Sequence, residues 1–350
     1  MRAALAVDLG GTALRVALVG EAGTLLARDA EPTLARDGPE AVIGQIVRLL
    51  RRMESRAEGC TIVGVGVGAP GPLDPGRGVV LRAPTLDGWS DVPLASILGT
   101  RLGRPVRLEN DANAAALGEW MFGAGQGTRH IVFVTVSTGI GGGVIVDGRL
   151  LHGWRGMAAE IGHMAVSERD IPCPCGSTGC WEALASGTAL ARFANAAATA
   201  AATGLPRDGS ISARDVVAAA AAGDPLASRL LDQEARWLGV GFANLLHLYS
   251  PERIIVGGGV SVGLEAMRPT IESVMSRRVM GAYRDVPLLH AALGADAGLV
   301  GAAGVILSDR VCVPGSSTPP GRGGMARAIA CSSGRCVGMA GGSARPISID

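Results

Sequence analysis

Apolar and polar positions in the first third of the chain follow the repeats expected for short strands and one helix. Residues 3–28 alternate in the manner of β-strands, and residues 61–67 form another apolar run that ends in a Pro-Gly turn. Between them, residues 39–53 carry apolar side chains at helical spacing. A further strand at 106–108 leads into a helix that begins near Asp111. These elements predict a first α/β unit.

The sequence after residue 130 again predicts strands that alternate with helices, and these helices are longer. Strands are predicted at 131–136 and 144–146, on either side of a glycine-rich stretch, and at 253–256 after the turn Ser250-Pro251. Helices are predicted from Ser186 onward and over the ranges 215–222, 226–248 and 298–307. Alternating strands and helices place the chain in the α/β class.

The order of these elements predicts two domains and a tail. We expect a smaller α/β domain over residues 1–115 and a larger one over 116–311, which carries a cysteine-rich loop and ends in the helix at 298–307. Residues 312–350 are rich in Gly, Ser, Pro and Arg without periodicity, which predicts a disordered tail. Its three cysteines match no zinc spacing, so no metal site is expected at Cys312, Cys331 and Cys336.

Two strand-turn-strand segments have the composition of phosphate-binding loops. Asp8 lies at the end of the first strand, and Gly10, Gly11 and Thr12 follow it. A second segment, 137–143, follows another apolar strand. Glycines let backbone N–H groups approach a phosphate, and Asp8 could hold Mg²⁺ directly or through water. The first segment alone could equally be an ordinary hairpin turn, but the pair suggests a duplicated fold around one polyphosphate.

One histidine and three cysteines are concentrated in a short segment, at positions His163, Cys173, Cys175 and Cys180. One imidazole and three thiolates are the ligand set of a closed, tetrahedral structural zinc site. The alternative is three unrelated thiols near a surface histidine. The chain has only 7 cysteines in 350 residues, and three of them are crowded here, so the spacing favours zinc.

Asp111 lies where a predicted strand meets a predicted helix, which is where α/β enzymes open their ligand crevice. Asn110 beside it offers a donor and an acceptor to a hydroxyl-rich ligand. Position alone does not distinguish this role from that of a helix N-cap, for which Asp is well suited.

Composition narrows the class of protein without identifying its chemistry. A net charge of +1 with 18% charged residues provides no strong field for nucleic acid or an anionic membrane. All 32 basic residues are arginine, which excludes a Walker lysine and a lysine nucleophile. The apolar run at 3–7 is too short for a signal-peptide core, and the run at 194–202 is too short for a membrane span. A cytoplasmic location, where thiols stay reduced, is therefore expected.

Five ordered motifs resemble the ROK group of bacterial sugar kinases and related repressors, within the actin-like ATPase superfamily. The likeness covers about residues 4–308. The motifs lie at 8–12, 64–71, 109–119, 137–143 and 160–182. Residues 117–120 and 123–125 look most like the glucokinase branch.

The resemblance implies a two-domain actin-like ATPase fold of the ribonuclease H-like type, with the active cleft between the domains. It implies that ATP, with Mg²⁺, phosphorylates O6 of glucose and that Asp111 is the catalytic base. Because phosphoryl transfer passes through a loose transition state, an Asp of ordinary acidity would suffice. The implied sugar contacts are Asn110, Asp111, Glu160, His163 and Glu182. The implied nucleotide contacts are Asp8, Gly10, Gly11, Thr12, Thr138, Gly139, Gly141, Gly258 and Gly259.

Zinc on His163 and the three cysteines would shape the sugar pocket without activating water. A homodimer or homotetramer is also implied. Two positions depart from the family pattern, because Ala159 and Ser137 stand where glycine is frequent. A methyl group at position 159 would matter if the backbone there has a positive φ.

Alternatives remain open at two levels. Glu182 could simply begin a helix, where an acid favours the dipole, and His163 could act only as a metal ligand. The enzyme could instead be an N-acetylmannosamine or N-acetylglucosamine kinase. A sugar-sensing repressor would need an N-terminal helix-turn-helix, for which a first motif at residue 8 leaves no room. A catalytically inactive sugar-binding module fits poorly, because Asp8 and Asp111 are both present.

Overall fold

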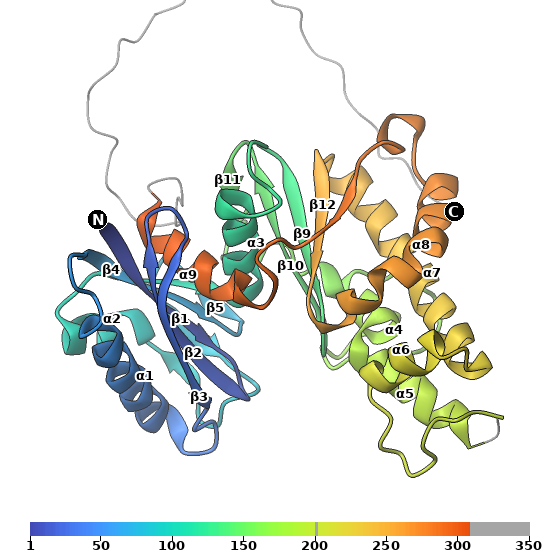
Figure 1. Ribbon diagram of the computed structural model, residues 1–350, viewed down its shortest axis with the longest axis horizontal. Helices are drawn as coiled ribbons and strands as arrows, with labels where there is room; N and C mark the ends of the chain where they lie inside the picture. The colour runs from blue at the N-terminus through green and yellow to red at the C-terminus, as the bar shows by residue number, and fades with distance from the viewer. Residues whose placement is uncertain (200–201, 309–350) are drawn as a thin grey trace, which may run out of the picture. The chain divides into compact units, whose positions relative to one another are not determined.

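The computed structural model describes residues 1–199 and 202–308. Two five-stranded sheets with their helices organise this part of the chain (Figure 1), so the predicted α/β class is confirmed. The tail predicted at 312–350, with its three cysteines, lies outside the described residues. Within the two described ranges, no helix is long and apolar enough to cross a membrane.

The first sheet has the strand order β3-β2-β1-β4-β8. Its strands are β1 (Arg2–Leu9), β2 (Ala13–Gly20), β3 (Leu25–Pro32), β4 (Thr61–Ala69) and β8 (Val106–Asn110). The hairpin strands β2 and β3 are antiparallel, whereas β1, β4 and β8 run parallel to one another. The carboxyl ends of β1 and β8 therefore lie at the same edge of the sheet, which brings Asp8 to the same edge as Asn110 and Asp111.

Alternation along β1 explains why helices cover both faces of this sheet. The helices are α1 (Gly38–Glu54), α2 (Leu94–Leu102) and α9 (Ala297–Leu307). The larger apolar residues of β1 pack with α1 and α2, whereas Ala4 and Ala6 pack with α9. Small residues are required on the α9 side, because a Cβ on Gly66 of β4 would lie 1.7 Å from the Ala302 carbonyl oxygen.

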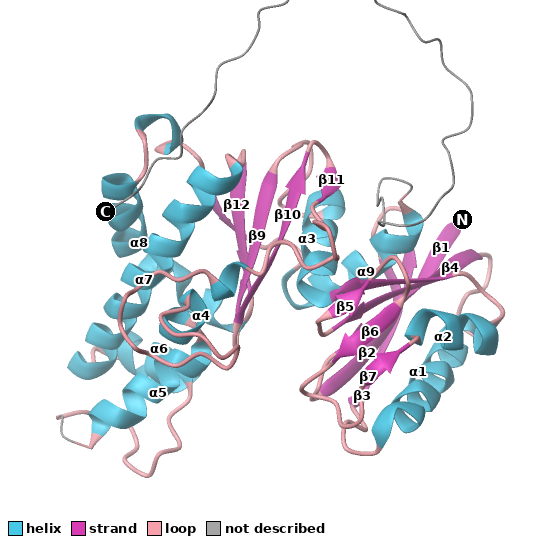
Figure 2. Ribbon diagram, turned by 180° about the vertical axis from the view of Figure 1, so that it is seen from behind, coloured by secondary structure: helices cyan, strands magenta, loops and turns pink. Residues whose placement is uncertain are grey.

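The second sheet has the order β11-β10-β9-β12-β13. Its strands are β9 (Ile131–Val136), β10 (Ile140–Val146), β11 (Arg149–Leu150), β12 (Arg253–Gly257) and β13 (Leu288–His290). Its helices are α3 (Asp111–Phe122), α4 (Trp181–Ala185), α5 (Gly187–Ala198), α6 (Ala213–Ala221), α7 (Pro225–Tyr249) and α8 (Leu264–Arg278). Helices α4 to α8 cover one face and α3 the other (Figure 2). A small third sheet joins β5 (Leu73–Asp74), β6 (Val79–Arg82) and β7 (Ser90–Val92).

Helices α3 and α9 pack backbone to backbone and connect the two sheets. A Cβ on Gly301 would lie 1.7 Å from the Ala114 carbonyl oxygen, and one on Gly118 would lie 2.7 Å from that of Ala297. Only glycine fits these positions without displacing the partner helix. Since α3 begins at Asp111, this close contact also fixes the position of the carboxylate at its first residue.

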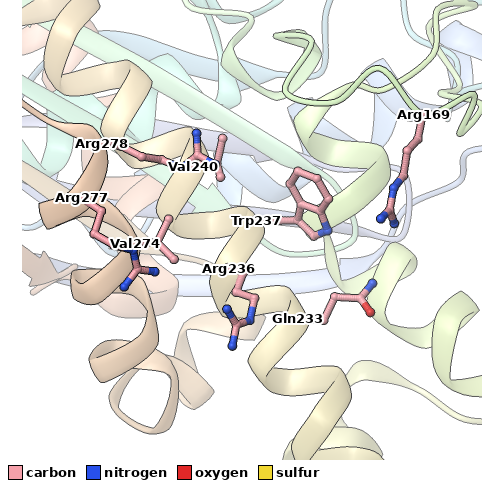
Figure 3. A pocket seen from close by; sticks show the side chains of 8 residues that line it. All are labelled: Arg169, Gln233, Arg236, Trp237, Val240, Val274, Arg277 and Arg278. Carbon is pink, nitrogen blue, oxygen red and sulfur yellow. The ribbon is translucent and has the colours of Figure 1, made fainter.

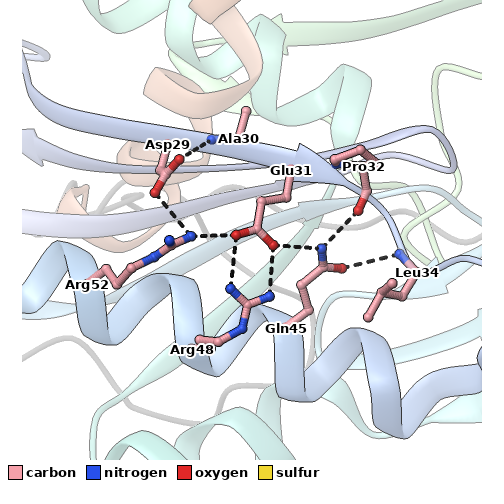
Figure 4. A network of polar contacts seen from close by, with 8 residues as sticks. All are labelled: Asp29, Ala30, Glu31, Pro32, Leu34, Gln45, Arg48 and Arg52. Atoms are coloured by element: carbon pink, nitrogen blue, oxygen red, sulfur yellow. Dashed lines mark hydrogen bonds and ion pairs between the residues drawn. The ribbon is translucent and has the colours of Figure 1, made fainter.

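An ion network joins β3 to α1 on the outer side of the first sheet (Figure 4). The Glu31 carboxylate accepts hydrogen bonds from both terminal nitrogens of Arg48, at 2.9 and 2.8 Å, and from Arg52 at 2.6 Å. Hydrogen bonds from Arg48 first, then Gln45 and Arg52, lower the pKa of Glu31 to about 2. Because the network is exposed, solvent screens it and its contribution to stability is small.

The strongly periodic segments form the predicted elements, and their bounds agree with the prediction to within a few residues. The helices expected at 39–53 and 226–248 are α1 and α7, and the strand expected at 253–256 is β12. The glycine-rich stretch at 137–143 differs, because β10 already begins at Ile140 and only residues 137–139 form a turn. The predicted boundary after residue 115 falls inside α3 and stays a prediction.

Candidate active site and metal cluster

The junction of β8 and α3 presents Asn110 and Asp111 side by side. Asn110 is the N-cap of α3: its Oδ1 accepts from the backbone N–H groups of Ala112, at 3.0 Å, and Asn113, at 3.1 Å. The alternative that Asp111 serves only as the N-cap is therefore wrong, because Asn110 fills that place and Asp111 is the first residue of the helix. Among residues 1–199 and 202–308, the Asn110 amide nitrogen has no hydrogen-bond partner, and a Cβ on Gly71 would lie 3.5 Å from it.

Asp111 is reachable by water, yet protein atoms surround it densely on its other sides. This burial is the largest cause that raises its pKa to about 6; the Ala112 N–H, which donates to Oδ1 at 2.8 Å, opposes the shift. The negative charges of Asp8 and Glu160 raise the pKa further. The pKa of Asp111 therefore lies above that of an ordinary aspartate, because the residue is buried and the fold brings three carboxylates from distant parts of the sequence together.

A buried pair, Glu109 and His152, supports this junction from inside the protein. Glu109 Oε2 lies 2.7 Å from His152 Nε2, and both side chains are almost fully buried. The other oxygen, Oε1, accepts from the Asn110 backbone N–H at 2.9 Å and from the Asn113 side chain at 3.1 Å. Sequence reasoning did not single out His152. Its only signal was an otherwise unexplained His-Gly pair in a loop, and the contact spans 43 residues.

The first glycine turn places Asp8 against the start of α9. A Cβ on Gly298 would lie 2.8 Å from Asp8 Oδ2, so the carboxylate needs glycine at that point of the helix. Arg15 Nη2 donates to Asp8, and Arg15 Nη1 donates to the Ala295 carbonyl at 2.6 Å. Burial raises the pKa of Asp8, and Arg15 opposes this effect. Gly10, Gly11 and Thr12 form the turn to β2, and Thr12 is exposed.

The second glycine turn lies beside the turn after β12. A Cβ on Gly258, which has φ +89°, would lie 2.4 Å from the carbonyl oxygen of Val136, and one on Gly259 would lie 3.8 Å from Ser137 Oγ. The exposed Thr138 and its neighbour Gly139 therefore lie close to this pair of glycines. Gly141 is separate from them, because it pairs with Thr135 inside the sheet. A Cβ there would press on Ala112 of α3 at 3.3 Å, so its position suits helix packing.

Glu182 connects the second glycine turn to α4. Its Oε2 accepts from the Ile140 backbone N–H at 2.9 Å, and a Cβ on Gly139 would lie 2.3 Å from the same oxygen. Glu182 is thus in the first turn of α4 and also holds the turn at 137–139, so it does more than begin a helix. Among the described residues, no hydrogen bond is made by its other oxygen, Oε1.

The four predicted metal ligands come together in one cluster. The side-chain ligand atoms of His163, Cys173, Cys175 and Cys180 all lie within 4.8 Å of one another. Cys173 Sγ is 3.6 Å from His163 Nδ1, and Cys175 Sγ is 3.7 Å from Cys180 Sγ. A tetrahedral zinc site has edges of about 3.6 Å between N and S and about 3.8 Å between two sulfurs. The donor set and its spacing therefore fit this ion.

The thiols are poorly arranged to exist as three free thiolates. Burial, followed by the two neighbouring sulfurs, raises the pKa of Cys180 to about 12, and burial also raises the pKa of Cys173. A hydrogen bond from the Ser177 backbone lowers the pKa of Cys175. A divalent cation at the centre would attract all three thiolates and offset the repulsion between them. The thiols are therefore expected to release their protons when the metal binds.

The segment before the cluster carries a strained residue. Ala159 has φ +66°, a left-handed conformation that favours glycine, so the departure from the family pattern at this position has a structural cost. Glu160 follows it and is exposed, and its backbone carbonyl accepts from the His163 N–H at 3.1 Å. The 3₁₀ helix η1 (Ile161–His163) rests on β10, because a Cβ on Gly162 would lie 2.0 Å from the Ile140 carbonyl oxygen.

Comparison with known proteins identifies the family. The profile of the ROK family matches residues 4–309. Glucokinase from Streptomyces coelicolor is 40% identical over 309 residues, which are 85% of this chain and 96% of that protein. The N-acetylmannosamine kinase of Escherichia coli is 35% identical over 299 residues, or 85% of this chain and 96% of that protein.

Among solved structures, the ROK family glucokinase from Streptomyces griseus, in complex with glucose and AMPPNP, has 39% sequence identity and a TM-score of 0.73. The match covers 86% of this chain and 98% of that chain. The two five-stranded sheets match the two-domain, actin-like ATPase fold that the sequence predicted. The chain belongs to the ROK family.

Proposed function

We propose that this protein is an ATP-dependent glucokinase, which transfers the γ-phosphoryl group of ATP to O6 of glucose. Its similarity to the glucokinases of Streptomyces coelicolor and Streptomyces griseus over most of its length supports the activity and the substrates. Within the structure, the proposal rests on Asp111, a water-accessible carboxylate at the end of β8 whose pKa is raised to about 6.

Asp111 is the proton acceptor for the sugar hydroxyl. A loose transition state requires little proton abstraction, so the main task of the carboxylate is to orient O6 and to take its proton late. With a pKa of about 6, Asp111 is a better acceptor than an ordinary aspartate. It is still about nine-tenths ionised at pH 7, so the base is available at neutral pH.

The sugar contacts converge on Asp111 from two sides. The Asn110 amide nitrogen, which has no partner in the described part of the chain, would donate to the sugar, and Glu160 lies near enough to affect the Asp111 pKa. His163 uses Nδ1 toward the cysteines, which leaves Nε2 for a sugar oxygen. The free oxygen of Glu182 is the fourth contact in this proposal. Such groups suit a pyranose, because each hydroxyl needs a partner when it leaves water.

The glycine turns form the nucleotide side of the site. Backbone N–H groups at Gly11 and Thr12, and at Thr138 and Gly139, would hold phosphates. The Gly10 N–H already donates to the Ala13 carbonyl at 3.0 Å, so Gly10 contributes to the site by shaping the turn. Gly258 and Gly259 lie beside the second turn, where the lack of side chains leaves room for the nucleotide. Mg²⁺, when bound with ATP, neutralises phosphate charge, and Asp8 is the residue that would hold it. Gly141, inside β10, is the weakest of the predicted nucleotide contacts.

Zinc in the His163 cluster is structural in this proposal. Four protein ligands close the coordination shell, so no position is left for a reactive water. The metal holds the segment that follows Glu160 and leads into Glu182, and so fixes three of the sugar contacts.

We also propose the domain boundary near residue 115, and assembly of the chain as a homodimer or homotetramer.

A substrate panel tests the proposed function. ADP release should be measured with glucose, mannose, fructose, N-acetylmannosamine and N-acetylglucosamine, and the product analysed for the position of the phosphate. Glucose should give the highest kcat/KM, with phosphate at O6. The similarity to an N-acetylmannosamine kinase makes that activity the second candidate. If N-acetylmannosamine exceeds glucose, the glucokinase assignment is wrong, even if Asp111 and the metal site keep their roles.

A further inference from the structure

A cavity of about 370 Å³ lies away from the site described above, on the outer side of the second sheet (Figure 3). It is bordered by the middle of α7, by the C-terminal end of α8, and by a residue of the loop that leads to the cysteine cluster. Two valines line it together with six polar or aromatic residues, Arg169, Gln233, Arg236, Trp237, Arg277 and Arg278. Its volume is within the range of small-ligand pockets, about 300–1,000 Å³.

Of the described residues that line this cavity, four are arginines and none is acidic. Arg236 has an ionic partner, Asp232, at 2.9 Å on the same helix, whereas Arg277 donates to the uncharged hydroxyl of Ser273 at 2.6 Å. Over residues 1–199 and 202–308, the side chains of Arg169 and Arg278 have no hydrogen-bond or ionic partner. Three of the four arginines, Arg169, Arg277 and Arg278, thus have no ionic partner among the described residues, and the cavity gathers positive charge that the protein compensates only in part.

The shape and the charge together indicate the chemistry of a ligand. Arginine forks bind phosphate oxygens through two parallel hydrogen bonds, and several forks around one space favour a ligand with more than one phosphate. The Trp237 ring extends between α7 and Arg169 and, with the two valines, provides an apolar wall (Figure 3). This combination suits a sugar bisphosphate better than a bare inorganic anion, because the carbon skeleton also finds a partner surface.

Two hydrogen-bonded connections join the cavity to the cysteine cluster, one through a tryptophan side chain and one through the backbone. The Trp237 carbonyl accepts from the indole N–H of Trp181 at 2.8 Å, and Trp181 lies between Cys180 and Glu182. On the other side, the Arg169 carbonyl accepts from the Ile171 N–H at 2.7 Å. The Ile171 carbonyl in turn accepts from Gly179, immediately before Cys180, at 2.9 Å.

We infer that this cavity binds a phosphorylated small molecule of the sugar-bisphosphate class, and that its binding increases the affinity of the protein for its sugar substrate. An anion held by Arg169 on one side and by Arg236 and Arg278 on the other restrains the loop that ends at Cys180. That loop carries His163 and leads to Glu182, so the restraint lowers the cost of ordering these side chains around a sugar. This effector site goes beyond the proposed phosphoryl transfer.

The test is direct binding to the full-length, metal-loaded protein. Calorimetric titration with fructose 1,6-bisphosphate should give one site per chain, and inorganic phosphate should bind about tenfold or more weakly at that site. The double variant Arg236→Gln/Arg278→Gln should lose the bisphosphate site. Arg229→Gln is the matched control, because it removes an exposed arginine of the same helix outside the cavity.

Coupling is measured by titrating the best sugar of the substrate panel with and without the bisphosphate, in the absence of nucleotide. The dissociation constant of the sugar should fall severalfold, and Arg169→Gln should reduce this change. Binding that survives the double substitution, or no binding at about 10 mM, would overturn the site. Binding without any change in sugar affinity would overturn the coupling.

A change of oligomeric state in the double variant, with bisphosphate binding intact, would show instead that the arginines line an interface between copies of the chain. Neither calorimetric result depends on catalysis. Failure of the effector site therefore leaves the proposed glucokinase activity untouched, and failure of that activity leaves bisphosphate binding measurable.

Discussion

The buried Glu109–His152 pair should be essential both for stability and for the rate of the reaction. His152→Phe fills the space of the imidazole but leaves Glu109 Oε2 without a partner in the protein interior. Removing one side of a buried, charge-assisted hydrogen bond costs about 3 kcal/mol. For a protein of this size, that corresponds to a fall in Tm of roughly 4–5 °C.

The same substitution should lower kcat more than it raises KM. Glu109 also holds the Asn110 backbone and the Asn113 side chain, on either side of Asp111, so its displacement moves the catalytic carboxylate. A misplacement of about 1 Å can reduce the rate by about 100-fold. KM should change less, because the backbone hydrogen bond from the Ala158 N–H to the His152 carbonyl, at 3.0 Å, does not involve the imidazole and still holds the loop that carries Glu160. His152 is in this account a positioning residue.

Two variants make the prediction refutable. His152→Gln retains a side-chain N–H that can reach Glu109, and it should restore most of the stability and of kcat. His290→Phe removes a histidine that also pairs with a glutamate, Glu265 at 2.9 Å, but at an exposed position, and it should leave Tm nearly unchanged. If calorimetry finds His152→Phe as stable as His290→Phe, or if kcat is unchanged while stability falls, the reasoning is wrong.

Three further changes have defined outcomes. The rate should fall about tenfold for each pH unit below 6, because protonated Asp111 cannot accept a proton. Glu160→Gln should shift the acidic limb of the pH–rate profile to lower pH, because it removes a charge that raises the Asp111 pKa. An unchanged profile would contradict this charge coupling. Purified protein should contain one zinc ion per chain by elemental analysis, and Cys175→Ser should lose both the metal and sugar affinity; full activity in metal-free protein would contradict the structural role. Ala159→Gly should raise the free energy of unfolding by about 1 kcal/mol, and with it Tm, because glycine adopts a positive φ without strain. A lower Tm would show that the strain is compensated elsewhere.

Local patterns in the sequence predicted what depends on local structure. The 25-residue helix α7 follows its apolar repeat almost to the residue, and the metal ligands follow from the spacing of one short segment. The glycines at 141–143 were assigned to a loop because glycine-rich composition is typical of loops. In the structure they lie in β10, where a Cβ on Gly143 would be 2.5 Å from the Ala116 Cβ of α3. Composition cannot distinguish a turn from a close approach of helix and strand.

Features that depend on distant contacts could not be predicted. The Asp111 pKa depends first on burial and then on the charges of Asp8 and Glu160, and these arise only when both sheets are assembled. The partner of Glu109 is His152, on a loop after β11, and no local pattern links the two. The role of Glu182 was partly hidden for the same reason, because its bond to Ile140 joins segments 42 residues apart.

The most direct test of the central claim is the rate of O6 phosphorylation of glucose by Asp111→Asn, measured beside glucose affinity and Tm. The amide keeps the shape of the side chain but cannot accept the proton, so turnover should fall by far more than tenfold while glucose still binds. The raised pKa means that the fold disfavours the ionised form of Asp111. Ionisation of this residue therefore lowers the stability of the protein as pH rises from 3.8 through 6, and the uncharged variant should be more stable at pH 7. The gain should be about 1 kcal/mol, because water reaches the side chain and screens it. A fall in turnover of less than tenfold, about 1.4 kcal/mol in the barrier, would contradict the assignment of Asp111 as the base.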